Sequence, residues 1–423
     1  MLDPAFIRKF PEVVRKGFAD KGESGELDWY LQLDKDHRAV LTEKEQVAAR
    51  QNQISKLIGM KTAKGEDSTA ERAEADGLKA ALKLLEERDA VLKQDKLRIQ
   101  MRMPNLAADD VPVGRTSDDN KVDATWGEKP AFDFTPKPHW ELGAALGAFH
   151  AETAGKISGA GFSLMTGPLA QLERALWNYM LDLHTREHGY TEVAVPYMVK
   201  EHALEGCGQL PKFETEMYRM RDDDLYLIPT AEVPLTNIHR QEILAAERLP
   251  IRYCAFSPCF RREAGAAGRD TRGLIRMHQF HKVELMVYTT PEEGDAEQMR
   301  IRTNAETILR NLKLPYRVLL LCTGDMSVNS RRTFDLELWA PGVGAWLEVS
   351  SISTFGDFQA RRAGIRFKRA GKTEYVHTLN GSGVALPRLL IAILENYQRA
   401  DGSVAVPDVL RPYLGWKSEL RPA

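Results

Sequence analysis

The chain has 423 residues, of which 28% are charged, and its formal net charge at pH 7 is −2. This length is sufficient for a large core and more than one domain. The near-neutral balance excludes a general polyanion binder, so any contact with nucleic acid must come from local basic patches.

Cysteine usage and hydropathy narrow the class of protein further. The four cysteines are scattered, at positions 207, 254, 259 and 322, and none belongs to a C-x-x-C pair. We therefore expect neither a zinc site nor a disulfide framework. No apolar run approaches the roughly 18 residues of a membrane span, and the N-terminus resembles no secretory or mitochondrial leader. These features predict a cytoplasmic protein without a membrane partner.

The N-terminal quarter of the chain predicts a helical cap over 1–26 followed by a helical arm over 27–101. The arm stretch carries 14 basic and 14 acidic residues and no proline. Apolar residues recur in it with a spacing of seven, in two ladders: Leu33, Val40, Val47 and Ile54, then Leu78, Leu85, Leu92 and Ile99. This pattern predicts an antiparallel coiled coil with a break near 59–65.

Polar residues at the other seam positions, such as His37, Lys44 and Asp89, predict a thin seam and a projecting arm. The heptads alone leave a dimerisation coiled coil equally open. A tip that binds nucleic acid is favoured because lysines near the predicted break can neutralise phosphates; these are Lys56, Lys61 and Lys64. We predict one domain over 1–110, which holds the arm, and a catalytic domain over 111–423.

The rest of the chain predicts an α+β fold. After a linker at 103–114 and a polar, loop-rich stretch at 117–138, helices are expected around 169–187 and 387–399. Between them, short β-rich segments cluster rather than alternating with helices: 191–195, 225–228, 251–256, 317–321, 334–339 and 346–350. This order predicts a mainly antiparallel sheet flanked by helices. No Rossmann or P-loop glycine motif follows a strand.

The most informative segment is a predicted hairpin over 259–284. Its first arm carries Arg261 and Glu263, its loop is rich in glycine, arginine and aspartate, and its return arm carries Arg276 and Glu284. Planar guanidinium groups bind phosphates and carboxylates through two hydrogen bonds at once. The hairpin therefore predicts a clamp for these groups, with a solvated charged hairpin as the alternative.

Two further segments carry carboxylates that suit a substrate site. In 229–234, Glu232 is bracketed by prolines and suits an ammonium group, although an ordinary loop acid is equally open. In 348–351, alternation puts Glu348 and Ser350 on one strand face with Ser351 at the strand end. A carboxylate there could hold Mg²⁺ on nucleotide phosphates, and a plain polar sheet face is the alternative.

The segment 378–388 predicts a strand that ends in a glycine-rich turn and opens a helix. Gly381 and Gly383 would let the backbone approach a ligand. Arg388, in the first helical turn, would favour a phosphate. A tight turn with a surface arginine is the alternative.

Together these segments resemble the motifs of the class II aminoacyl-tRNA synthetases. The hairpin resembles motif 2, 378–388 resembles motif 3, and 189–196 resembles motif 1, the dimer strand. With the Thr-Ala-Glu loop at 230–232 and the helical arm, the chain resembles the seryl-tRNA synthetase family over essentially its full length. The resemblance implies a homodimer that uses ATP and Mg²⁺ to activate L-serine as seryl-adenylate and to charge tRNA(Ser). It leaves tRNA(Sec) open as a second acceptor, and it implies that the arm recognises tRNA shape from the partner subunit.

The resemblance also implies a role for each matching residue. The catalytic pair is Arg261 and Arg388, of which Arg261 would bridge the α-phosphate and the serine carboxylate. The implied serine-binding residues are Thr230, Ala231, Glu232, Arg261, Glu284, Asn380 and Ser382. The implied ATP-binding residues are Arg261, Arg262, Glu263, Arg276, Phe280, Glu348, Val349, Ser350, Ser351 and Arg388. Glu348 and Ser351 would also hold Mg²⁺, and no nucleophilic side chain is needed.

Three positions depart from the family pattern. Ile352 stands where a small thiol is common, Gly161 where a basic residue is common, and His281 where an acid is usual. Three other classes of protein are the alternatives: an RNA-binding subunit without catalysis, a ligase that loads a carrier protein, and a coiled-coil scaffold. The first would lack residues such as Arg261 or Arg388 and the second would lack the arm, whereas the chain has all of these.

Overall fold

The computed structural model describes residues 1–264 and 272–423, so the glycine-rich part of the predicted hairpin loop lies outside the described residues. The described chain divides into two compact units. The smaller unit contains 2–19 and 23–104, and the larger contains Met1, 20–22 and 105–423. The division at 104/105 falls slightly before the predicted domain boundary at 110.

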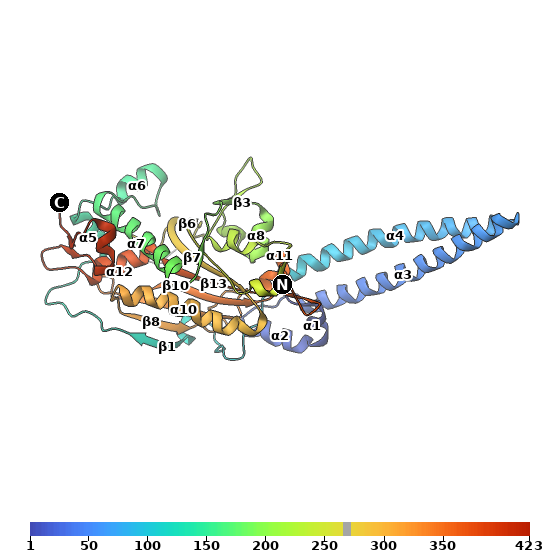
Figure 1. Ribbon diagram of the computed structural model, residues 1–423, viewed down its shortest axis with the longest axis horizontal. Helices are drawn as coiled ribbons and strands as arrows, with labels where there is room; N and C mark the ends of the chain where they lie inside the picture. Colours follow the sequence, from blue (N-terminus) through green and yellow to red (C-terminus); the bar gives the residue numbers. More distant parts are fainter. Residues whose placement is uncertain (265–271) are drawn as a thin grey trace. The chain divides into compact units, whose positions relative to one another are not determined.

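The smaller unit is entirely helical (Figure 1, blue). Its helices are α1 (Pro4–Lys9), α2 (Pro11–Asp20), α3 (Leu27–Lys64) and α4 (Thr69–Gln100). Helices α3 and α4 pack against each other as an antiparallel pair, which confirms the predicted coiled-coil arm. Helix α3 continues through Gly59 and ends only at Lys64, because Gly65 takes a left-handed φ of 69° and its amide caps the helix at Thr62.

The seam between α3 and α4 contains ionic as well as apolar layers. Its buried apolar residues include Val40, Ile54, Leu85 and Ile99. Asp89 accepts hydrogen bonds from Lys44 at 2.9 Å and contacts His37 Nε2 at 2.8 Å. Asp34, only 1% exposed, accepts from Lys96 at 2.9 Å. The polar seam positions are thus paired with each other across the arm, which favours one register of the two helices.

Replacing Asp34 by alanine should loosen the arm, because Lys96 would stay half-buried without its carboxylate partner. We expect the local opening free energy of α3 and α4 to fall by about 3 kcal/mol. Amide hydrogen exchange of the full-length chain measures this change. Glu43→Ala, at an exposed position of the same helix, is the control and should leave exchange unchanged; equal effects of the two substitutions would contradict the prediction.

The larger unit is built on an eight-stranded sheet with the order β1-β8-β9-β10-β13-β7-β6-β2. All neighbours are antiparallel except β2 and β6, which confirms the predicted α+β class. In this order the strands are Lys121–Trp126, Tyr316–Leu320, Arg332–Ala340, Ala345–Gly356, His377–Ala385, Gln279–Thr289, Ile251–Phe260 and Thr191–Glu192. Strand β1 lies in the stretch predicted as loop, although its six residues do alternate between polar and apolar. It is a short edge strand with mostly exposed residues, and a single alternation of this length within a polar stretch is a weak signal.

Small sheets and helices surround this sheet. The short strands are β3 (Met198–Val199), β4 (Tyr226–Leu227), β5 (Ile243–Ala245), β11 (Arg366–Arg369), β12 (Lys372–Tyr375), β14 (Val404–Ala405) and β15 (Glu419–Leu420). The helices are α5 (His139–Ala145), α6 (Ala151–Ser158), α7 (Gly167–Arg186), α8 (Glu201–Cys207), α9 (Glu232–Asn237), α10 (Gly294–Asn311), α11 (Phe358–Ala363) and α12 (Leu386–Asn396). Among the described helices, none combines the length and apolar character that crossing a bilayer requires.

On the central strands β7 and β13, alternate residues face opposite sides of the sheet. On the first face, residues such as Leu285 and Leu379 join the main core, which α7, α10 and α12 complete. On the second face, Ser382 of β13 lies opposite Glu284 of β7 in the strand register. Asn380, two residues before Ser382, shares this face. The polar side chains of the two strands therefore lie side by side.

Gly381 and Gly383 lie inside β13, which corrects the predicted glycine-rich turn. A Cβ atom on Gly381 would come within 2.4 Å of Ile301 in α10, and one on Gly383 within 2.6 Å of His184 in α7. Close packing of helices on the sheet, rather than approach of a ligand, therefore requires glycine here. Arg388 does lie in the first turn of α12.

Candidate active site

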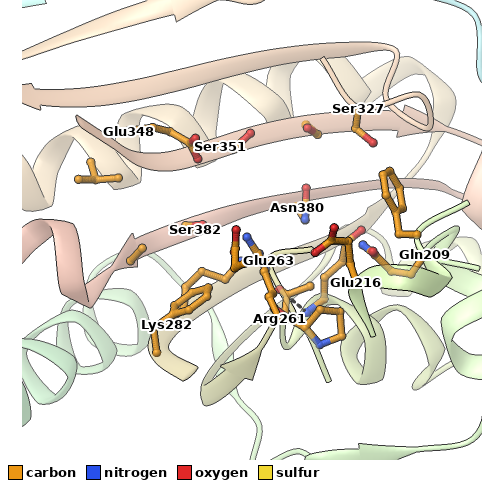
Figure 2. A pocket seen from close by; sticks show the side chains of 18 of the residues that line it. Gln209, Glu216, Arg261, Glu263, Lys282, Ser327, Glu348, Ser351, Asn380 and Ser382 are labelled. Atoms are coloured by element: carbon orange, nitrogen blue, oxygen red, sulfur yellow. Dashed lines mark hydrogen bonds between the residues drawn. The ribbon is translucent and has the colours of Figure 1, made fainter. Parts of the chain in front are cut away.

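A cavity of about 520 Å³ opens over the polar face of β7, β10 and β13. Most of the residues singled out from the sequence line it: Thr230, Glu232, Arg261, Glu263, Arg276, Phe280, Glu348, Val349, Ser351, Asn380, Ser382 and Arg388. Figure 2 shows four of them on two neighbouring strands: Glu348, Ser351, Asn380 and Ser382. Segments that are far apart in the sequence thus meet around one space.

One end of the cavity rests on the buried carboxylate of Glu284. Glu284 is 0% exposed and lies behind the lining residues. It accepts hydrogen bonds from the Thr230 hydroxyl at 2.9 Å and from Asn380 Nδ2 at 3.2 Å, and it forms an ion pair with Lys282. Both carboxylate oxygens are therefore engaged, and this end presents a small polar surface of hydroxyl, amide and ammonium groups.

A second buried carboxylate, Glu232, shares this end. It is the first residue of α9 rather than a loop residue, and it accepts a hydrogen bond from Gln359 Nε2 at 2.7 Å. Burial and the neighbouring charge of Glu284 raise the pKa of Glu232 to about 7. A cationic group that entered the cavity would relieve this repulsion, so the pocket suits an ammonium group.

Arg261 links this end to the rest of the cavity. It follows β6, and its Nε donates to the Pro229 carbonyl at 3.3 Å. Its guanidinium lies 5.1 Å from the ring centroid of Phe280, and its charge acts to lower the pKa of Glu232. Arg262 points elsewhere: it is exposed, does not line the cavity, and its amide donates to the Glu216 carbonyl. This corrects its predicted place in the ATP site, because successive residues of an extended chain face opposite sides.

The far end of the cavity carries two arginines that are bound to acidic residues. Arg276 forms an ion pair with Glu263. Arg388 donates to the Glu348 carbonyl at 2.8 Å, lies 3.6 Å from its carboxylate, and donates from Nε to the Ile275 carbonyl at 3.3 Å. Both guanidinium groups are thereby held in place at the cavity wall, where planar donors suit phosphate oxygens.

A β-bulge decides which serine of β10 reaches the cavity. The register with β9 shifts between Glu348 and Ser350, so Ser351 rather than Ser350 shares the cavity face with Glu348. The Ser350 hydroxyl instead donates to the Ser382 carbonyl at 2.7 Å in the buried interior. Two sequence predictions are therefore wrong: Ser350 does not face the cavity, and Ser351 does not end its strand. Ala231 is likewise fully buried and outside the lining.

The chemistry of the donors near Glu348 suits Mg²⁺. The Glu348 carboxylate and the Ser351 hydroxyl are oxygen ligands of the kind that Mg²⁺ takes while it keeps waters and phosphate ligands. Asp335 lies opposite Ser351 in the register, and its Oδ1 is buried without a hydrogen-bond partner. Burial and the charge of Glu348 raise the pKa of the Asp335 carboxyl, so a cation bound near Glu348 would favour the ionised form of Asp335. Within the described residues, no group of three or more histidine, cysteine or acidic side chains could hold a metal by itself.

Several residues around the cavity were not predicted from the sequence. Lys282 lies two residues before Glu284, on the same face of β7, and this spacing could have identified it. The wall formed by Gln209, Phe213, Glu216, Ser327 and Asn329 carries no motif-like signal. Gln359 lies behind the cavity wall, and only its hydrogen bond to Glu232 in the folded structure connects it to the site.

The return end of the hairpin loop is held by a buried histidine. His139 Nε2 accepts the amide hydrogen of Leu274 at 3.0 Å, and its Nδ1 lies 2.9 Å from the carboxylate of Glu395. Glu395, 0% exposed, also accepts from the amides of Gly342 and Val343. Gly273, with φ of 67°, is pressed against the His139 ring, where a Cβ would come within 2.2 Å of it. This network places the cavity residues that follow Gly273.

The three departures from the family pattern have local explanations. Ile352 is fully buried in the main core, where it packs against Gly381. Gly161 has a φ of 79° and lies against His278, which leaves no room for a side chain. His281 faces α7, with Nδ1 3.0 Å from Glu173, and lines a smaller neighbouring cavity rather than the main one.

The lysines near the arm tip differ in their surroundings. Lys56 and Lys64 are exposed, whereas Lys61 forms an ion pair with Glu71 on the opposite helix. Lys61 therefore also stabilises the helix pair, and its charge is partly compensated.

Comparison with known proteins identifies relatives over the whole chain. The family described as "Seryl-tRNA synthetase N-terminal domain" matches residues 1–107, and the "tRNA synthetase class II core domain (G, H, P, S and T)" matches 212–397. A serine–tRNA ligase from Syntrophotalea carbinolica is 51% identical over 98% of both chains. The seryl-tRNA synthetase from Pyrococcus horikoshii, solved in complex with ATP, has a TM-score of 0.95 at 38% identity over 100% of both chains. The Naegleria fowleri cytoplasmic enzyme, solved with AMP, has a TM-score of 0.90 at 26% identity, covering 100% of this chain and 99% of that one.

Replacing Glu395 by leucine should destabilise the larger unit, because it removes the acceptor of the buried His139 ring and of three backbone amides, those of His139, Gly342 and Val343. We expect the free energy of unfolding to fall by about 3 kcal/mol or more, and the Leu274 amide to exchange faster with solvent. Urea unfolding and hydrogen exchange measure the two effects. Glu374→Leu, at a partly exposed strand position, is the control; an unchanged Leu274 amide in Glu395→Leu would contradict the assigned network.

Proposed function

Because the chain belongs to the seryl-tRNA synthetase family, and is therefore a serine–tRNA ligase, we propose that both steps of the reaction take place in the cavity over β7, β10 and β13. The observation that carries this proposal is the difference in charge between the two ends of the cavity. One end is built on two buried carboxylates and suits a small zwitterion, the other end carries Arg276 and Arg388, and Arg261 lies where it can reach both.

L-serine binds at the carboxylate end. Its ammonium group is held by Glu232, and its hydroxyl is selected by the group formed by Thr230, Glu284 and Asn380. An amino acid that lacks the hydroxyl would displace water from these polar groups without replacing its hydrogen bonds, and it is rejected for that reason. Ser382 and Lys282 complete the polar wall.

ATP binds along the rest of the cavity. Phe280 offers a flat face for the adenine, and Arg276 and Arg388 hold the phosphates. Glu263 and Val349 lie along the same wall. Mg²⁺ held by Glu348 and Ser351 would neutralise negative charge on the phosphates. The ATP-complexed Pyrococcus horikoshii relative supports this assignment.

In the first step an oxygen of the serine carboxylate attacks the α-phosphorus, and the bond to the β-phosphate breaks to release pyrophosphate. Arg261 donates to the carboxylate and the α-phosphate and so stabilises the negative charge of the transition state. In the second step a ribose hydroxyl at the 3′ end of tRNA(Ser) attacks the seryl carbonyl, and AMP leaves. Positioning and electrostatics account for both steps.

The arm supplies the tRNA specificity in this proposal. Its exposed Lys56 and Lys64 provide positive charge near the tip. An arm that recognises tRNA shape from the partner subunit implies a dimer. We propose a homodimer formed through the motif 1 segment 189–196, which contains the edge strand β2. The seryl transfer would serve protein synthesis in the cytoplasm, with tRNA(Sec) as a second candidate acceptor.

Serine should stimulate the exchange of labelled pyrophosphate into ATP, and alanine should do so with a kcat/KM about 10⁴-fold lower. Arg261→Gln should reduce serine-dependent exchange about 10³-fold, because it removes a donor to the transition state. Arg262→Gln is the matched control, since Arg262 is exposed and lies outside the cavity. No serine-dependent exchange in the unmodified chain would refute the proposed activity.

Deletion of 34–96, with a short linker, should leave exchange intact and reduce charging of tRNA(Ser) by at least about 10³-fold, because the phosphate contacts of the arm are lost. Charging is measured as serine attached to tRNA at a fixed salt concentration. Charging at the full rate would contradict the role assigned to the arm. Lys56→Ala with Lys64→Ala should produce a smaller loss that depends on salt.

A further inference from the structure

Gln359, the second residue of α11, lies next to Glu232 but behind the cavity wall. Its side chain is 0% exposed and does not line the cavity. Its Nε2 donates to Glu232 Oε1 at 2.7 Å and to the Cys207 carbonyl at 2.9 Å. Its Oε1 accepts the hydroxyl hydrogen of Thr378 at 2.8 Å. All three hydrogen bonds are buried and share the single amide group of Gln359, so the geometry of each depends on the others.

These contacts determine which way the amide faces. The backbone carbonyl of Cys207 can only accept a hydrogen bond, so Nε2 must face it. The second hydrogen of Nε2 then points at Glu232, and Oε1 points at Thr378. A flipped amide would set its oxygen against two acceptor oxygens in a buried site, which is costly. Gln359 is therefore held as a donor to Glu232.

Charged and titratable groups from several elements face Glu232. Glu284 and Lys282 come from β7, Arg261 follows β6, and the Cys207 thiol ends α8. Burial and Glu284 raise the pKa of Glu232, whereas the bond from Gln359, and then Lys282 and Arg261, act to lower it. Gln359 is the group whose direct hydrogen bond to Glu232 opposes protonation of that carboxyl.

We propose that Gln359 is a positioning residue of the serine pocket, which orients the Glu232 carboxylate as the acceptor for the ammonium group of the amino acid. The inference rests on the proposed function, in which Glu232 binds that ammonium group. Gln359 acts through Glu232 and does not contact the substrate. Because the hydrogen bond favours the ionised carboxylate, its loss weakens serine binding most where Glu232 is closest to being protonated.

Gln359→Met removes both donor hydrogens at nearly constant volume. In the exchange assay, the KM for serine should rise about tenfold at pH 7 while the KM for ATP is unchanged. In the unmodified enzyme the serine KM should climb as the pH falls below about 7, the pKa of Glu232. In the variant this climb should begin about one pH unit higher, so the defect shrinks as the pH is raised.

Gln298→Met is the matched control. Gln298 is also 0% exposed, and its Nε2 bridges the carbonyls of Arg332 and Ile352 at 2.9 and 3.2 Å, without a carboxylate partner. It should lower thermal stability comparably and leave the pH profile for serine unchanged. As a second probe, 3-hydroxypropionate lacks the ammonium group, and as a competitive inhibitor it should bind the unmodified and Gln359→Met enzymes equally.

Two results would overturn the proposal: equal weakening of serine and 3-hydroxypropionate in Gln359→Met, or an unchanged pH profile for serine. Absence of serine-dependent exchange in the unmodified enzyme would instead refute the proposed function. If Gln359→Met does not fold, Thr378→Val provides the test, because it removes the hydroxyl that fixes the amide. It should shift the serine profile in the same direction by a smaller amount, and no shift would overturn the proposal.

Discussion

The cavity depends on keeping two carboxylates, Glu232 and Glu284, buried side by side. Neighbouring buried carboxylates disfavour each other's ionisation unless donors and cations surround them. Glu284 meets this requirement within the protein, through Lys282, Thr230 and Asn380. Glu232 meets this requirement only in part, and its pKa is therefore raised. The pocket therefore suits a cationic group, and in the proposed function the ammonium group of serine is that group.

The same strands that hold these groups also build the core. On β7 and β13 the residues that alternate with the polar ones pack against α7 and α10, at a distance so short that β13 requires Gly381 and Gly383. A polar group attached to such strands moves little, because displacing it means displacing the core. The selectivity of the pocket is thus set by the packing on the opposite face of the sheet as well as by the residues that line it.

The arginines at the other end of the cavity are held by acidic neighbours. Arg276 is paired with Glu263 and Arg388 with Glu348, and the backbone at Ile275 supports Arg388 from a second side. A phosphate that binds these arginines exchanges one anionic partner for another, so their donors stay aligned throughout. The His139–Glu395 network holds the same stretch of backbone through the amide of Leu274. Binding residues near the hairpin are accordingly positioned by two independent anchors.

Local patterns in the sequence were sufficient for the helical arm, the antiparallel α+β class and many of the polar residues that line the cavity. Heptad spacing identifies α3 and α4, and short motifs identify Arg261, Glu232 and Arg388, because their physical signals lie within a few neighbouring residues. Only the tertiary structure decided which side chains face the cavity. Because of the bulge in β10, Ser351 rather than Ser350 faces the cavity. The glycines of β13 are explained by close helix packing rather than by a turn.

The contacts that support the site residues could not be predicted from the sequence, for the same reason. Gln359 reaches Glu232 across 127 residues of chain, and His139 reaches Glu395 across 256. Such pairs leave no periodic or local signal, because they depend on strand register and on how closely distant helices pack. The sequence by itself therefore determined which chemical groups the site contains. The folded structure determined how those groups are oriented and charged, since orientation and pKa depend on burial and on neighbours that only the fold brings together.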